Sequence, residues 1–146
     1  MWIDVVGLFL LLSGFVIGLG AVTVIDIHGV LGMRSVYWTQ TAVRVQKVTK
    51  PLIWVGITLC VIGGSIYYRF ETLSGVVLYH TVAASLLVIN GAFLSFVASP
   101  YLLLRERQGK SEELLERSWQ VKIALSLLVS DFLWWSSLVG LALYLA

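Results

Sequence analysis

The stretch 5-VVGLFLLLSGFVIGLGAVTVI-25 contains 21 consecutive residues without a charged side chain. A helix that crosses the roughly 30 Å hydrocarbon core of a bilayer needs about 20 apolar residues. A cleavable secretory signal would carry a basic segment before its apolar run, whereas the charged residue before this stretch is Asp4. We therefore predict a retained transmembrane helix over residues 4–25.

Three further apolar segments of similar length follow along the chain, and they predict spans at 51–68, 76–99 and 122–145. Of the 146 residues, 59% are hydrophobic and 12% are charged, whereas about a quarter of the residues in a soluble domain are charged. A soluble chain this short could not hide so much apolar surface. We expect one all-α membrane domain over residues 1–146, an integral four-transmembrane-helix antiparallel bundle.

The basic residues are distributed unevenly, and this distribution predicts the orientation. Nine of the ten lie in or beside two predicted loops, 33–50 and 105–121, and the tenth, Arg69, lies in the short loop 69–75. The positive-inside rule assigns the two basic loops to the cytoplasm. We expect a plasma membrane protein, of the prokaryotic inner membrane, with both termini outside and with anionic lipid at its basic loops.

Two segments on the basic side should extend the helical structure beyond the spans. Residues 34–49 are long enough for an interfacial helix, and Pro51 suits the first turn of the second span. Ser111 can cap a cytoplasmic extension of the fourth helix, in which Glu113 and Arg117 have i,i+4 spacing. Pro100 should bend or end the third span.

Small residues recur at helical spacing in the spans. They are Gly7, Gly14, Gly18 and Ala21 in the first, Gly56 and Gly63 in the second, and Gly91 in the third. Membrane helices associate through close packing of such residues, because lipid tails compete equally for larger apolar side chains. The pattern favours tight packing within the bundle, and it leaves open an oligomer interface on the first span.

Polar residues inside the spans are candidate functional groups. An ionisable side chain costs about 2.5–3.5 kcal/mol at the centre of a membrane helix. Asp131 and Asn90 lie at similar predicted depths, and His80 lies near the outer interface. Structural hydrogen bonds between helices are the ordinary explanation. The alternative is an intramembrane site for protons or a ligand, with His80 as a haem ligand.

Asp26, His28 and Arg34 form a second polar cluster, at the predicted cytoplasmic end of the first span. We expect Asp26 to pair with Arg34 or with a basic residue between 44 and 50, the usual outcome at a helix end. An Asp-x-His pair alone is too sparse to predict a metal site. The single cysteine, Cys60, excludes an intramolecular disulfide.

No catalytic motif identifies an enzyme, because the sequence lacks a P-loop, a nucleophile elbow, an HExxH pair and a glycine-rich dinucleotide turn. The net charge of +2 gives no basis for nucleic-acid binding. We expect a non-enzymatic oligomeric or accessory subunit without a cofactor, in a homo-oligomer or larger membrane complex, acting through its glycine-rich helices and basic loops. The alternative is a haem-binding or proton- or ion-conducting bundle, although two histidines at opposite ends oppose a haem held by both.

Overall fold

A computed structural model describes residues 2–110 and 113–146, and the regular structure within them is entirely helical. The elements are α1 (Trp2–Gly32), α2 (Val36–Tyr67), α3 (Gly75–Phe93), the π-helical segment η1 (Leu94–Ala98), α4 (Ser99–Arg107) and α5 (Arg117–Leu145). Since α3, η1 and α4 are continuous, four helices are long and apolar enough to cross a membrane. This confirms the all-α class and the four apolar helices.

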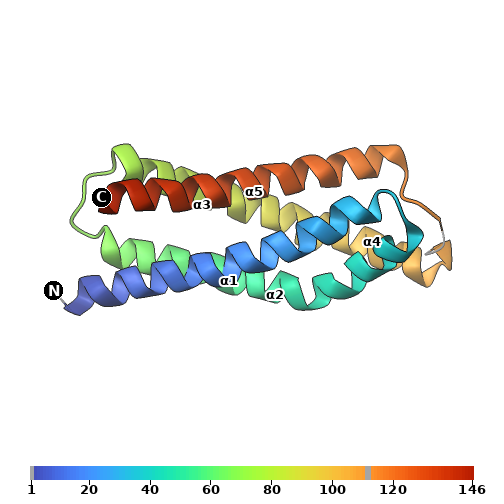
Figure 1. The fold of residues 1–146 in the computed structure, drawn as a ribbon, viewed down its shortest axis with the longest axis horizontal. Coiled ribbons are helices and arrows are strands. Elements are labelled where there is room, and N and C mark those ends of the chain that lie inside the picture. Colours follow the sequence, from blue (N-terminus) through green and yellow to red (C-terminus); the bar gives the residue numbers. More distant parts are fainter. Residues whose placement is uncertain (1, 111–112) are drawn as a thin grey trace.

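The helices run up and down along one long axis (Figure 1). Both termini and the α2–α3 turn lie at one end, here called the terminal end, and the connections after α1 and after α4 lie at the other, the basic end. At 1.5 Å per residue, the 31 residues of α1 extend about 46 Å. This exceeds the roughly 30 Å hydrocarbon core of a bilayer, so the helices are long enough to project beyond it.

Glycines bring α1 and α2 into backbone contact. A Cβ atom on Gly14 would lie 2.7 Å from the backbone nitrogen of Cys60, and one on Gly56 would lie 2.6 Å from that of Gly18. A Cβ on Gly7 would lie 2.8 Å from the Tyr67 nitrogen. Real side chains cannot occupy such space, so the glycines are what permits this close antiparallel hairpin. Ala21 is buried as well. Gly91 has a looser environment, because a Cβ added there would lie 3.6 Å from the Trp54 ring, an ordinary contact distance.

The helix α5 packs on this hairpin through a buried indole. Trp134 is 1% exposed, covers Gly18 of α1 and meets the Phe15 ring edge-on at 5.9 Å. On its other side, α5 contacts α3. The hairpin and the α3–α5 pair thus form two layers with Trp134 between them.

Residues 34–49 do not form a separate helix. They belong almost entirely to α2, which begins at Val36 and continues through Pro51 to Tyr67, so Pro51 lies inside the helix and not in its first turn. Contacts with the end of α1 hold this first half of α2, since the Thr39 hydroxyl donates to the Gly32 carbonyl at 2.6 Å and Trp38 meets His28 edge-on.

The cytoplasmic extension predicted for the fourth helix is shorter than expected. The helix α5 begins at Arg117, and Ser111 lies outside the described residues. Glu113 lies 3.8 Å from Arg105, an alternative to the i,i+4 pairing with Arg117 that the sequence suggested. Arg105 also donates to three backbone carbonyls in the loop after α4, so this loop is organised by a side chain from the preceding helix.

Candidate functional site: a polar cavity between the two helix layers

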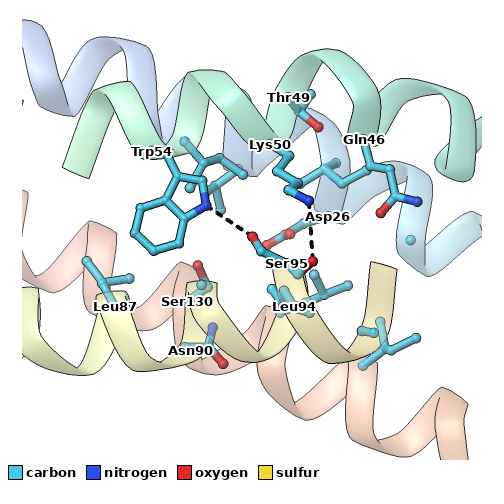
Figure 2. Close-up of a pocket in the computed structure, with 18 of the residues that line it drawn as sticks. Asp26, Gln46, Thr49, Lys50, Trp54, Leu87, Asn90, Leu94, Ser95 and Ser130 are labelled. Carbon is cyan, nitrogen blue, oxygen red and sulfur yellow. Dashed lines mark hydrogen bonds between the residues drawn. The ribbon is translucent and has the colours of Figure 1, made fainter. Parts of the chain in front are cut away.

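A cavity of about 120 Å³ lies between the α1–α2 hairpin and the α3–η1 and α5 helices. Its walls combine apolar side chains with a set of polar ones, which are Asp26, Gln46, Thr49, Lys50, Trp54, Asn90, Ser95 and Ser130. Figure 2 shows the carboxyl group of Asp26, from α1, on the same side of the cavity as Lys50 and Ser95. One acid, one base and several neutral hydrogen-bonding groups therefore share one enclosed space.

The π-helical segment positions the lysine of this cavity. The backbone N–H of Ser99 donates to the Leu94 carbonyl, five residues back, and so does not donate to the carbonyl of Ser95. The next residue, Pro100, has no N–H to offer. The Ser95 carbonyl instead accepts a hydrogen bond from Lys50 Nζ at 3.3 Å. Pro100 therefore does not end the third helix, and the π segment next to it provides an acceptor for a charged side chain.

The indole of Trp54 fixes the other polar group of Ser95. Its Nε1–H donates to the Ser95 hydroxyl at 3.0 Å (Figure 2). Gln46, Lys50 and Trp54 are spaced i, i+4 and i+8, so all three project from one face of α2. One stripe of α2 therefore provides an amide, an ammonium group and an indole to the cavity.

Three buried side-chain atoms within the described residues lack a hydrogen-bond partner, namely Asp26 Oδ2, Gln46 Nε2 and Trp134 Nε1. All three residues line this cavity. Buried polar groups in proteins are nearly always paired with protein or with ordered water. The cavity is large enough to hold several water molecules. An acceptor and two donors are thus available to bound water or to a small polar ligand.

A second carboxyl group lies close to the first. Asp131 of α5 is near enough to Asp26 of α1 for their negative charges to repel each other. Asn90 bonds elsewhere, donating from Nδ2 to the Ser126 carbonyl at 3.0 Å and accepting from the Ser126 hydroxyl at 2.6 Å. Asn90 therefore bonds to Ser126 of α5 and not to Asp131, the partner that their similar predicted depths made possible.

The structure separates the residues of the predicted cytoplasmic-end cluster. Asp26 lines the cavity together with Lys50, which lies in the 44–50 segment. The Nδ1–H of His28 donates to the Val24 carbonyl at 2.7 Å, and its ring contacts Trp38. Arg34 is exposed in the turn between α1 and α2. Asp26 thus belongs to the cavity, and the other two residues belong to the helix end.

His80 lies at the terminal end, in a separate polar group. Its Nε2 lies 2.8 Å from the Ser137 carbonyl, and its Nδ1 lies 3.0 Å from the Tyr68 hydroxyl. A carbonyl only accepts, so Nε2 carries the hydrogen and Nδ1 of the neutral ring accepts from Tyr68. A haem iron would have to displace one of these two partners. Among the described residues, no three His, Cys, Asp or Glu side chains gather as metal ligands.

Sequence reasoning missed Gln46, Ser95 and the role of Lys50. The prediction of an interfacial helix over 34–49 and a separate span from Pro51 did not place Gln46, Lys50 and Trp54 on one continuous helix, so their common face was not recognised. The i,i+4 spacing of Gln46, Lys50 and Trp54 is the pattern that could have identified them. No sequence pattern indicates that the Ser95 carbonyl is available to Lys50, because this depends on the backbone hydrogen bonds of the π segment.

Together, the fold and the cavity define an all-helical protein with four helices of membrane-crossing length and a polar site between them. Comparison of the chain with protein-family models, with curated proteins and with solved structures gives no match in any of the three.

Proposed function

We propose that the protein is an integral protein of a prokaryotic inner membrane, with both termini outside, that conducts protons through its polar cavity. The observation that carries this proposal is the presence of three unpaired polar atoms around one cavity that also contains a lysine. Ionisable groups inside membrane helices are costly, and in membrane proteins they typically mark ion pathways and proton relays.

The chemistry of the cavity suits proton exchange. Asp26 can accept a proton, and Lys50 provides a positive charge that a nearby carboxylate or hydroxide would neutralise. Bound water would link these groups, because the cavity is large enough for a small cluster and its unpaired atoms offer both donors and acceptors.

A route beyond the cavity would lead toward the terminal end. There a second cavity, of about 670 Å³, shares Ile57, Leu87 and Trp134 with the first. These three side chains form the partition between the two spaces. Protons that cross the membrane through this bundle would have to pass the Trp134 indole, whose N–H lacks a partner.

Proton flux into liposomes tests the proposal. The purified protein is reconstituted with a trapped pH-sensitive dye, and a potassium diffusion potential drives protons inward. We expect flux above that of protein-free liposomes, and an at least tenfold loss in Asp26→Asn. Asp4→Asn is the matched control, because Asp4 lies on the same helix but pairs with Arg69 at 2.6 Å, outside the cavity. Flux equal to that of protein-free liposomes, or equal in Asp26→Asn and wild type, would refute the proposal.

The orientation has its own test. We expect a C-terminal alkaline phosphatase fusion to be active, because that enzyme matures outside the cytoplasm. The same fusion inserted after Gly109, in the basic loop, should be inactive. The opposite pattern would contradict the positive-inside assignment and leave the cavity unaffected.

A second candidate function is that of an oligomeric or accessory subunit. It is favoured by the nine basic residues at or near one end and by the large apolar surface of the helices. Because Gly7, Gly14, Gly18 and Gly56 already pack between α1 and α2, a partner would have to bind another face or the basic loops. The mass of the detergent-solubilised particle tests this, since a single chain without a partner argues against it.

A further inference from the structure

The larger cavity is a groove between α2 and α3 in the terminal half of the molecule. These two helices contact each other far less than α1 and α2 do. The groove has a volume of about 670 Å³, within the range of typical ligand pockets, about 300–1,000 Å³. It is large enough for a lipid-sized ligand.

The groove has an apolar floor and a polar rim. Leu11, Phe15 and Ile57 line it on the hairpin side, and Leu87 and Trp134 line it toward the polar cavity. The polar residues on its walls are Ser65, Tyr68, Glu71, His80, Thr81, Ser85 and Ser137. This gradient fits an amphiphile with its tail against the floor and its head toward the terminal end.

The charges on the rim disfavour an anionic head. Among the described residues that line the groove there is no lysine or arginine, and Glu71 contributes a negative charge. The nearby Arg69 is engaged with Asp4 and with the Ile66 carbonyl. An anionic phosphate head would therefore meet a carboxylate without a compensating cation, which disfavours anionic phospholipids such as phosphatidylglycerol.

The hydroxyl hydrogens of Tyr68, Thr81 and Ser85 are already used. Tyr68 donates to His80 Nδ1, Thr81 donates to the Val77 carbonyl at 2.8 Å, and Ser85 donates to the Thr81 carbonyl at 2.8 Å. Their oxygens keep lone pairs, and the Glu71 carboxylate is also an acceptor. These four groups present acceptors, so the head that matches them best is uncharged and carries a donor.

We propose that this groove binds a hydroxyl-headed, uncharged membrane lipid of the diacylglycerol type. The hydroxyl head donates to the acceptor oxygens of the rim, and an acyl chain lies along the apolar floor. An isoprenoid quinone has an apolar tail of the same kind, but its carbonyl head only accepts hydrogen bonds and leaves the rim without a donor. The inference does not depend on proton conduction, although a bound lipid would fill the terminal half of the proposed route.

Native mass spectrometry of the full chain in detergent tests the proposal with three probes, dioleoylglycerol, ubiquinone and dioleoylphosphatidylglycerol. We expect one retained dioleoylglycerol per chain and at least tenfold weaker retention of the other two. Equal retention of ubiquinone or of phosphatidylglycerol would overturn the assignment of the head group.

Two variants locate the site. Ala84 lines the groove, so Ala84→Phe should abolish dioleoylglycerol retention, whereas Ala142→Phe, at an exposed position of α5, should leave it unchanged. Thr81→Val removes one acceptor at almost constant volume and should weaken retention about two- to tenfold, as expected for one hydrogen bond. If Ala84→Phe does not fold, Thr81→Val carries the test. Wild-type retention in a folded Ala84→Phe protein, or in Thr81→Val, would refute the site.

Discussion

Replacing Gly14 by alanine should separate α1 from α2 and destabilise the protein. A Cβ at this position would lie 2.6 Å from the Cys60 sulfur and 2.7 Å from both the Cys60 nitrogen and the Gly56 carbonyl oxygen. Two of these three atoms belong to the backbone, so a change of side-chain rotamer cannot relieve the overlap. The two helices have to move apart.

The magnitude follows from these distances. Bringing the 2.7 Å contacts to about 3.5 Å requires a separation of about 0.8 Å, and a gap of about 0.5–1 Å forfeits a quarter to a half of the dispersion energy of each affected contact. Overpacking of this kind costs about 1–3 kcal/mol. At about 2–4 °C per kcal/mol for a chain of this size, the melting temperature should fall by about 2–12 °C.

Cys60 provides the assay, because it is the only cysteine of the chain. A maleimide dye that fluoresces on thiol reaction reports its exposure during heating in detergent. Gly20→Ala is the matched control, since Gly20 lies on the same helix and a Cβ there meets nothing within 4 Å. We expect an early transition in Gly14→Ala and an unchanged one in Gly20→Ala. Equal transitions in the two variants would refute the glycine contact as the basis of the hairpin.

Three further predictions concern other contacts. Asn90→Ala removes both hydrogen bonds to Ser126 and should lower the free energy of unfolding by about 0.6–1.7 kcal/mol. In the same thermal assay, adding Ser126→Ala to this variant should lower stability little further, and fully additive effects would contradict the pairing. Arg105→Gln removes donors to three loop carbonyls and should accelerate trypsin cleavage of the loop after α4, whereas an unchanged rate would show that the loop is held otherwise. Tyr68→Phe removes the donor to His80 and should lower stability by about 0.5–1.5 kcal/mol, an effect that His80→Ala should largely abolish.

The long apolar helices could be predicted from the sequence because their signature is length and composition, which a bilayer dictates directly. The sequence also suggested a helix over 34–49, but not that this helix continues through Pro51 into the second span. Residues 36–50 carry charges and many β-branched side chains, and their helix is held by contacts with the end of α1, such as Thr39 with Gly32. Such tertiary support leaves no local pattern in the sequence.

The candidate site was predictable only in part, for the same reason. Asp26, Asn90 and Asp131 attract notice because polar groups are rare in apolar runs. Lys50 looked like one of several loop cations, and only the continuous helix through Pro51 brings it into the bundle. The acceptor that fixes Lys50 arises from a change of backbone register at Ser95, a property of the folded helix that residue types alone do not reveal.

Trp134 lines both cavities and would couple them if a ligand moved its ring. Its ring forms part of the wall of both cavities and rests directly on Gly18. A side chain at position 18 would overlap this ring. A ligand that shifts this ring from the groove side changes the volume and the donors available to water on the other side. If a ligand in the groove changes the affinity of the polar cavity for water or protons, linkage requires that water or protons change the affinity of the groove for its ligand by the same factor. One buried indole would therefore be sufficient for allosteric coupling between two sites on opposite halves of the bundle.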